Sequence, residues 1–288
     1  MRTGRIHHAL SLENTTHQTT MKKLIVALPY CNADHASATR LLNWIAELDP
    51  KIDHHLLLVA DAAVPLEIKK SIDTLGKCIF TSAETIMPKC PAPVNGNYHG
   101  PAAVMFEKTM AHVHTCHRWD FLWMEPDCVV LKSGWLDALA EAYDNQPKRF
   151  FGSMQKTDGK DNLPATAFFA TAIYPRNSHE ELRQFCAGRD KAFDMAFSDY
   201  VVQRATNSPL FQHVFGAPDD PPTFKELKLP NDGPNVGTLD SISKQAVLFH
   251  RCKDGSLIDV LKKSAPESVM AKPSEPTPTV QTRIWKKA

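Results

Sequence analysis

The sequence predicts an α/β protein in which helices flank a mostly parallel central sheet within a single domain. Two continuous apolar runs of strand length, residues 22–30 and 54–61, alternate with segments whose apolar residues recur at helical spacing. Continuous apolar runs are typical of strands that are covered on both faces, as in a parallel sheet. The order strand, helix, strand, helix, strand is the one that right-handed crossovers produce.

The first half of the chain supplies three of the expected strands. Its predicted elements are, in order, a strand over 22–30, a helix over 36–49, a strand over 54–61, a helix over 65–76 and a strand over 77–83. Apolar residues at helical spacing predict both helices. Asp34 or Ser37 is expected to cap the first helix, and Gly76 is expected to end the second.

A long loop separates this half from the next one. Residues 86–101 hold four prolines, and such a long irregular stretch in a compact domain is usually functional or mobile. The elements predicted after it are a helix over 102–116, a strand pair within 119–135, a helix over 136–145, strands over 149–155 and 165–175, a helix over 190–205 and a strand over 246–252. Ser133 is expected to cap the helix that follows it.

Two carboxylates, Glu125 and Asp127, interrupt the apolar segment 121–136. Pro126 between them rules out regular strand pairing, because proline fixes φ and lacks a backbone donor. A strand that ends here, at the carboxyl edge of a parallel sheet, places both acids in the crevice where ligands bind. Their spacing suits a hard divalent ion such as Mg²⁺ or Mn²⁺ that shares its shell with a diphosphate. The alternative is an ordinary turn at the end of a strand.

The segment "WDFLWMEPDCVVLKSGWLDAL" resembles the DxD region of GT-A glycosyltransferases, the nucleotide-diphosphosugar transferase fold. The order of "LIVALPY", "LLLVAD", "ATAFFATAIYPRN" and "AVLFHRCKDGSLIDVL" extends the resemblance over most of the chain. It implies a Rossmann-like GT-A domain over residues 21–262, with a flexible extension over 1–20 and a tail over 263–288. Glu125 departs from the family pattern, which more often has aspartate at this position.

The resemblance implies roles for the residues that match the donor and metal sites. Pro29 and Tyr30 correspond to a platform for the base and ribose of the donor, and Asp61 corresponds to a hydrogen-bond acceptor for the same groups. Asp127 corresponds to the direct metal ligand, with Glu125 directed toward the metal, its water or the ribose. For the tyrosine, an ordinary position at a strand end is the alternative.

Four further positions complete the implied site. His250 corresponds to the late histidine that completes the metal shell, although a histidine after an apolar strand is often structural. Lys253 is expected to neutralise the departing diphosphate, with a solvated turn lysine as the alternative. Asp194 is the preferred general base for an inverting reaction, and Asp199 is the second candidate. As an alternative, acidic residues are also common at the start of a helix because their negative charge interacts favourably with the helix dipole.

The implied activity is transfer of a sugar, from a uridine diphosphate sugar, to an acceptor hydroxyl in the presence of Mn²⁺ or Mg²⁺. The chain is similar to enzymes of bacteriophage and bacterial type, some of which glycosylate hydroxymethylated pyrimidines in DNA and others surface polysaccharide. The sequence has 33 Lys plus Arg against 32 Asp plus Glu, so a DNA acceptor would require a local basic surface. A sugar nucleotidyltransferase of the same fold and a nucleotide-sugar-binding protein without turnover are the alternatives.

The remaining sequence features predict the cellular compartment of the protein and which residues pack in its core. Seven cysteines without a CxxC pair predict neither a zinc site nor a disulfide framework, and no apolar run is long enough for a membrane span. A cytoplasmic location follows, which is the host cytoplasm for a phage protein. His112, His114 and His117 are interpreted as part of a core helix without an acid nearby, and Trp123 is interpreted as packing.

Overall fold

The computed structural model describes residues 22–93, 98–157, 164–187, 191–213, 222–229 and 235–264. The predicted extension over 1–20 lies outside these ranges, as does the predicted tail over 263–288 apart from residues 263 and 264, which belong to the last helix. The elements in chain order are β1 (Ile25–Tyr30), α1 (His35–Leu48), β2 (Ile52–Ala60), α2 (Leu66–Ile79), β3 (Phe80–Ile86), α3 (His99–Cys116), β4 (Phe121–Trp123), β5 (Val129–Val130), α4 (Trp135–Asp144), β6 (Phe150–Lys156), β7 (Thr166–Tyr174), α5 (Ser178–Leu182), the 3₁₀ helix η1 (Arg183–Cys186), α6 (Phe193–Val202), β8 (Ala205–Asn207), β9 (Phe211–His213), β10 (Thr223–Phe224), β11 (Val236–Gly237), the 3₁₀ helix η2 (Leu239–Ser241), β12 (Leu248–His250) and α7 (Ser256–Ser264).

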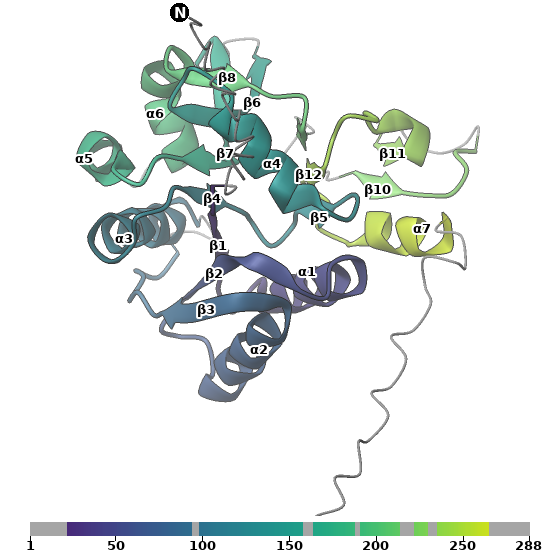
Figure 1. Ribbon diagram of the computed structural model, residues 1–288, viewed down its shortest axis with the longest axis horizontal. Helices are drawn as coiled ribbons and strands as arrows, with labels where there is room; N and C mark the ends of the chain where they lie inside the picture. The colour runs from purple at the N-terminus through teal and green to yellow at the C-terminus, as the bar shows by residue number, and fades with distance from the viewer. Residues whose placement is uncertain are drawn as a thin grey trace, which may run out of the picture.

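A seven-stranded sheet forms the centre of the molecule, with the strand order β3-β2-β1-β4-β7-β6-β8 (Figure 1). β1 pairs in parallel with β2 and β4, and β2 pairs in parallel with β3. β7 runs antiparallel to its neighbours β4 and β6, whereas β8 lies parallel to β6. The mostly parallel sheet and its flanking helices confirm the predicted fold class.

Helices cover both faces of this sheet, and each face has its own hydrophobic core. Val26 and Leu28 of β1 pack with residues of α1, α2 and α4. Ile25 and Ala27, which point the other way, pack with residues of α3, α5 and α6. Figure 1 shows the same division, with α3, α5 and α6 to the left of the sheet and α1 and α4 to its right. A strand buried on both faces needs apolar residues at every position, which explains why β1 is continuously apolar.

A smaller three-stranded sheet, β5-β12-β9, lies beside the acid segment. β12 runs antiparallel to β5 and parallel to β9, and His250 of β12 stands opposite His213 of β9. The backbone N–H of Cys252 donates to the carbonyl oxygen of Asp127 over 2.9 Å. This sheet therefore brings the late histidine next to the acid segment. β10, β11 and α7 form the right-hand edge of the molecule in Figure 1.

The predicted end of the second helix at Gly76 is wrong. α2 continues to Ile79, and β3 begins at the next residue. A Cβ atom at Gly76 would lie 2.5 Å from Cδ2 of Leu56. This glycine therefore allows a close approach between α2 and β2 and does not end the helix.

The predicted cap of the fourth helix is also wrong. Gly134, at φ 69°, is the residue before α4, and its conformation is one that glycine adopts without steric cost. The hydroxyl of Ser133 and the N–H of Gly134 bond to the carboxylate of Asp49. Asp34 does precede α1, but its carboxylate accepts a hydrogen bond from the N–H of Cys31 and caps no helical N–H.

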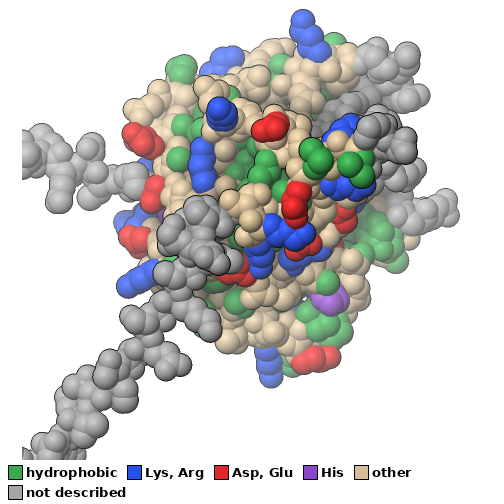
Figure 2. Space-filling view, turned by 90° about the vertical axis from the view of Figure 1, so that its right-hand side faces the viewer, with side chains coloured by type: hydrophobic (Ala, Val, Ile, Leu, Met, Phe, Trp, Pro, Cys, Tyr) green, Lys and Arg blue, Asp and Glu red, His purple; other side chains and the backbone are tan. Residues whose placement is uncertain are grey.

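The surface carries charges of both signs. Figure 2 shows the face with β10, β11 and α7, where Lys and Arg side chains are interspersed with Asp and Glu over the part that is visible. The visible part of this face therefore has no continuous basic stripe. Among the described residues, no helix combines the length and the apolar character needed to cross a membrane.

Candidate active site

A cavity of about 600 Å³ opens at the carboxyl edge of the central sheet. The described residues that line it come from the end of β1, the loop before α1, the start of α3, the turn after β4, the start of α6 and the turn before α7. Six of the residues predicted for the donor, metal and base sites lie in this lining: Pro29, Tyr30, Glu125, Asp127, Asp194 and Lys253. The structure therefore gathers most of the predicted set around one cavity.

The acid segment forms a turn between two short strands. β4 ends at Trp123, and the N–H of Cys128 donates to the carbonyl oxygen of Glu125 over 3.0 Å. Regular pairing stops at Pro126, as its missing N–H requires. The turn directs Glu125 and Asp127 to the cavity, which both residues line.

His250 meets both acids from the neighbouring sheet. Its Nε2 lies 2.6 Å from Oε2 of Glu125 and 3.2 Å from Oδ1 of Asp127, and the residue is 7% exposed. Burial disfavours the charged ring, but the carboxylates outweigh it and raise the pKa of His250 to about 10. Burial likewise opposes ionisation of Asp127, yet His250 and Lys253 lower its pKa below the usual value. The imidazolium thus occupies the place where two carboxylates converge.

The chemistry of this cluster fits a hard divalent ion. Oδ1 of Asp127 is buried, and although it lies near His250 it receives no hydrogen bond from any described residue. Ligand atoms of Asp127, Cys128 and His250 all lie within 4.8 Å of one another. Burial raises the pKa of the Cys128 thiol well above its ordinary value, so oxygen and nitrogen are the donors available at neutral pH. Carboxylate oxygens with one imidazole suit Mg²⁺ or Mn²⁺.

His213, which the sequence did not single out, orients His250. Nδ1 of His213 lies 2.7 Å from Nδ1 of His250, and its ring stacks on Phe169 with the centroids 3.5 Å apart. Burial and the positive charges of His250 and Arg251 lower the pKa of His213. A neutral His213 therefore accepts the Nδ1 proton of His250, which directs Nε2 toward the acids. His213 lies near His250 because β9 pairs with β12. Each of these strands has three residues, which is too short for a pattern that could be recognised in the sequence.

Asp194 lies in the first turn of α6, where Oδ1 accepts the N–H of Met195 over 2.9 Å and Oδ2 accepts that of Ala170 over 3.3 Å. Burial, with a smaller contribution from the charge of Glu125, raises the pKa of Asp194 to about 7. Asp199 is exposed on the same helix and does not line the cavity. The structure thus separates the two candidate bases.

Two buried donors in the cavity wall lack acceptors. The hydroxyl of Tyr30 and Nε1 of Trp123 have no hydrogen-bond partner among the described residues, and each residue is 1% exposed. Trp123 packs edge-on against Phe106, as the packing interpretation expected, but it also lines the cavity. Buried polar groups without partners are rare in native structures, and a ligand is one way to satisfy them.

The remaining predicted residues lie at the rim. Asp61 follows β2, and its N–H bonds to the carbonyl oxygen of Tyr30, but it is not part of the cavity lining. Lys253 is exposed and lines the cavity. Asp34, which was predicted only as a helix cap, lines the cavity as well. Burial and the charges of Asp127 and Glu125 raise the pKa of Asp34, although the hydrogen bond from the Cys31 N–H opposes this shift.

The comparisons with known proteins concern the fold. No family model and no curated protein matches the sequence. Among solved structures, the bifunctional glycosyltransferase WbbM aligns with 89% of this chain at 13% identity and a TM-score of 0.51. This chain spans about half the length of that protein, 51%.

Two further solved structures align less closely. Galactosyltransferase LgtC, solved with donor and acceptor sugar analogues, aligns with 85% of this chain and 98% of its own at 11% identity and a TM-score of 0.47. Mannosyltransferase PcManGT from Pyrobaculum calidifontis, solved with GDP-Man and Mn²⁺, aligns with 66% of this chain and 55% of its own at 13% identity and a TM-score of 0.45. The conclusion rests on the sheet order, the cavity at its carboxyl edge and the WbbM comparison: this chain has the GT-A glycosyltransferase fold.

Proposed function

We propose that this protein is a metal-dependent glycosyltransferase that moves a sugar from a nucleotide diphosphate donor to an acceptor hydroxyl. The observation that supports this most is the meeting of Glu125, Asp127 and His250 beside a cavity that Asp194 also lines. Two carboxylates and a histidine form a cation site, and a separate carboxyl with a raised pKa can act as a base. Donor, metal and base functions are then distributed around one cavity.

The donor is proposed to be a uridine diphosphate sugar. Pro29 and Tyr30 would support its base and ribose, and Asp61 at the adjacent rim would accept a hydrogen bond from them. The unpartnered hydroxyl of Tyr30 and Nε1 of Trp123 offer donors to its polar atoms. Lys253 contributes a positive charge at the cavity for the diphosphate.

Asp127, His250 and Glu125 are the residues that would hold Mn²⁺ or Mg²⁺. When bound, such an ion neutralises negative charge on the diphosphate as it leaves. His213 keeps Nε2 of His250 directed at the site through the contact between their Nδ1 atoms. The partial burial of this cluster lowers the local dielectric constant, which strengthens each of these electrostatic interactions.

Asp194 is proposed as the general base of an inverting reaction. The acceptor oxygen attacks the anomeric carbon while the bond from that carbon to the diphosphate oxygen breaks. The acceptor proton passes to the Asp194 carboxylate, and the nucleoside diphosphate departs with the bonding electron pair. The raised pKa of Asp194 makes it a stronger base than an ordinary carboxylate.

The acceptor is proposed to be either a hydroxymethylated pyrimidine in phage DNA or a surface polysaccharide. A DNA acceptor requires basic residues next to the cavity and binding that weakens steeply with salt. The visible part of the face in Figure 2 has mixed charges, so that face offers no continuous basic surface for DNA. A cytoplasmic setting remains part of the proposal, and the seven cysteines, all of them free, are compatible with it.

Donor hydrolysis tests this function against its two alternatives. The purified chain is incubated with a panel of nucleotide sugars and Mn²⁺, and release of free sugar and nucleoside diphosphate is measured. Asp127→Asn should abolish the release, whereas Asp144→Asn, at an exposed position on α4, should leave it unchanged. Pyrophosphate-dependent formation of a nucleoside triphosphate would indicate a nucleotidyltransferase, and binding without turnover would indicate a binding protein. Equal release by the parent and Asp127→Asn would contradict the metal assignment.

A further inference from the structure

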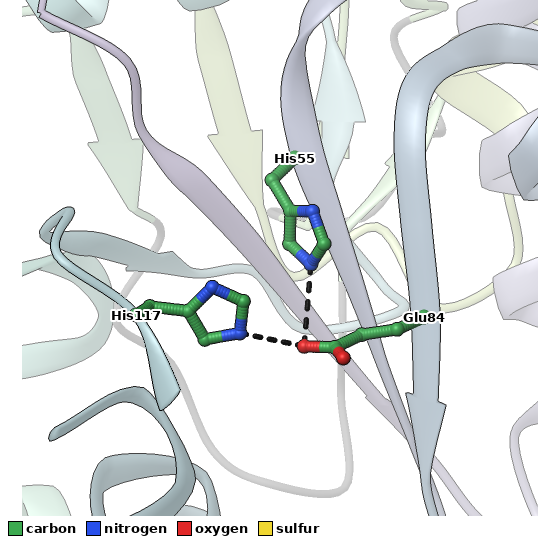
Figure 3. A group of neighbouring side chains, drawn as sticks. All are labelled: His55, Glu84 and His117. Carbon is green, nitrogen blue, oxygen red and sulfur yellow. Dashed lines mark hydrogen bonds and ion pairs between the residues drawn. The ribbon is translucent and has the colours of Figure 1, made fainter. Parts of the chain in front are cut away.

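A second group of metal-ligating side chains lies away from the cavity. His55 comes from β2, Glu84 from β3, and His117 directly follows α3. Nε2 of His117 lies 2.6 Å from Oε1 of Glu84, and Nε2 of His55 lies 3.3 Å from the same oxygen. Figure 3 shows both rings pointing at this single oxygen from different elements.

This group corrects the interpretation of the histidine-rich helix end. That interpretation expected no acid near His112, His114 and His117, and it is wrong for all three. Nε2 of His112 lies 2.9 Å from Oε1 of Glu84, the oxygen that His117 also contacts. His114 points elsewhere, with Nε2 3.7 Å from Glu180. The acid was missed because it comes from a strand distant in sequence.

We propose that His55, Glu84 and His117 form a binding site for a divalent transition-metal ion of the Zn²⁺ class. Their ligand atoms all lie within 4.8 Å of one another. A tetrahedral zinc ion with bonds of about 2.0–2.1 Å separates its ligands by about 3.3 Å. The distance of 3.3 Å from His55 to Glu84 already matches this value. The distance of 2.6 Å from His117 to Glu84 would have to lengthen by about 0.7 Å, which a small rotation of the glutamate side chain provides.

Neighbouring residues orient the ligands as a metal site requires. Nδ1 of His55 lies 2.7 Å from the hydroxyl of Ser82, so its Nε2 is the nitrogen left to face Glu84. Metal-bound histidines almost always fix their second ring nitrogen with such a partner. His112 holds the Glu84 carboxylate and acts as a positioning residue. The fourth position of the ion is left for water.

The chemistry of the two sites selects different ions. Imidazole nitrogens suit zinc, nickel and copper, whereas the carboxylate-rich site at Asp127 suits Mg²⁺ or Mn²⁺. The Glu84 side chain is 37% exposed and that of His117 is 12% exposed, so an ion can reach the site from solvent. This site is therefore separate from the proposed catalytic metal in both place and preference.

The ion would anchor α3 to the central sheet. His55 and Glu84 belong to neighbouring strands, and His117 fixes the last turn of the helix to them. The first turn of the same helix, at His99 and Pro101, lines the donor cavity. A metal at one end of α3 thus restrains the helix that forms part of the cavity wall at its other end.

Zinc titration of the full chain tests this site. The chelator-treated protein is titrated with Zn²⁺ by calorimetry in buffer with excess Mg²⁺, and its melting temperature is measured with and without Zn²⁺. The parent should bind one tight equivalent and melt at a higher temperature, because an ion that binds the folded form stabilises it. His117→Ala and Glu84→Gln should lose this equivalent, and Ser82→Ala should weaken it by about 10-fold or more.

His114→Ala is the matched control, because this residue lies on the same helix turn but contacts Glu180. It should retain the affinity and the thermal shift of the parent. All variants keep the seven cysteines and the histidines at 7, 8 and 17, so binding to those residues cancels in the comparison. The same zinc affinity in the parent and His117→Ala, no thermal shift in the parent, or sulfur ligands in the X-ray absorption spectrum of the bound zinc would overturn the proposal.

Discussion

The proposed base makes a quantitative prediction about pH. A general base acts in its ionised form, so activity should rise with pH until Asp194 is deprotonated. With a pKa of about 7, this carboxyl is about one tenth ionised at pH 6, because each pH unit below the pKa changes the ratio of the two forms tenfold. An unburied aspartate would be fully ionised over this range. Turnover divided by KM should therefore fall about eightfold from pH 7.5 to pH 6 and level off above pH 8.

The assay is transfer to the acceptor, or donor hydrolysis where no acceptor is known, at saturating Mn²⁺ and a series of pH values. Asp194→Asn should lower the rate by about 100-fold to 10,000-fold and remove the pH dependence in this range. Asp199→Asn decides between the two carboxylates of α6, and it should behave as the parent. A flat profile between pH 5.5 and 8, an inflection near pH 4, or a larger loss for Asp199→Asn would refute the assignment.

Three further predictions concern packing, backbone and metal orientation. Phe106→Ala, at a fully buried position between the helices and the sheet, should lower the free energy of unfolding by about 3–5 kcal/mol in urea denaturation, and a loss below about 1 kcal/mol would contradict this packing. Gly255→Ala should cost about 1–2 kcal/mol in the same assay because Gly255 has φ 76° and a Cβ there would meet Arg40; an unchanged midpoint would contradict the backbone argument. His213→Ala should weaken Mn²⁺ binding by about 10-fold to 100-fold in calorimetry with little change in melting temperature, and unchanged Mn²⁺ affinity would show that His250 needs no such partner.

The central part of the fold could be predicted because its signals are local. Strands buried on both faces must be apolar at every position, and the helices between them repeat their apolar residues at helical spacing. Gly76 shows where such signals fail: a glycine that permits close packing has the same letter as one that ends a helix. The three-residue strands β9 and β12 are too short to carry a periodic pattern.

The candidate site likewise contains some features that are local in the sequence and others that depend on distant contacts. Pro126 between two acids is a local feature, and the turn it predicts is present. His213 could not be found, because its nearness to His250 depends on the pairing of β9 with β12, two strands that are distant in sequence. Glu84 near His117 is a further contact of this kind, which arises from a strand and a helix end that the sequence alone does not bring together.

Binding of a nucleoside diphosphate tests the central claim most directly, namely that Asp127 and His250 hold a divalent ion for the donor diphosphate. Calorimetric titration of the chain with uridine diphosphate should give saturable binding with Mn²⁺ and binding at least tenfold weaker after the metal is chelated. His250→Ala should abolish the difference between these two conditions. Equal affinity with and without Mn²⁺ in the parent, or a full metal effect in His250→Ala, would contradict the account.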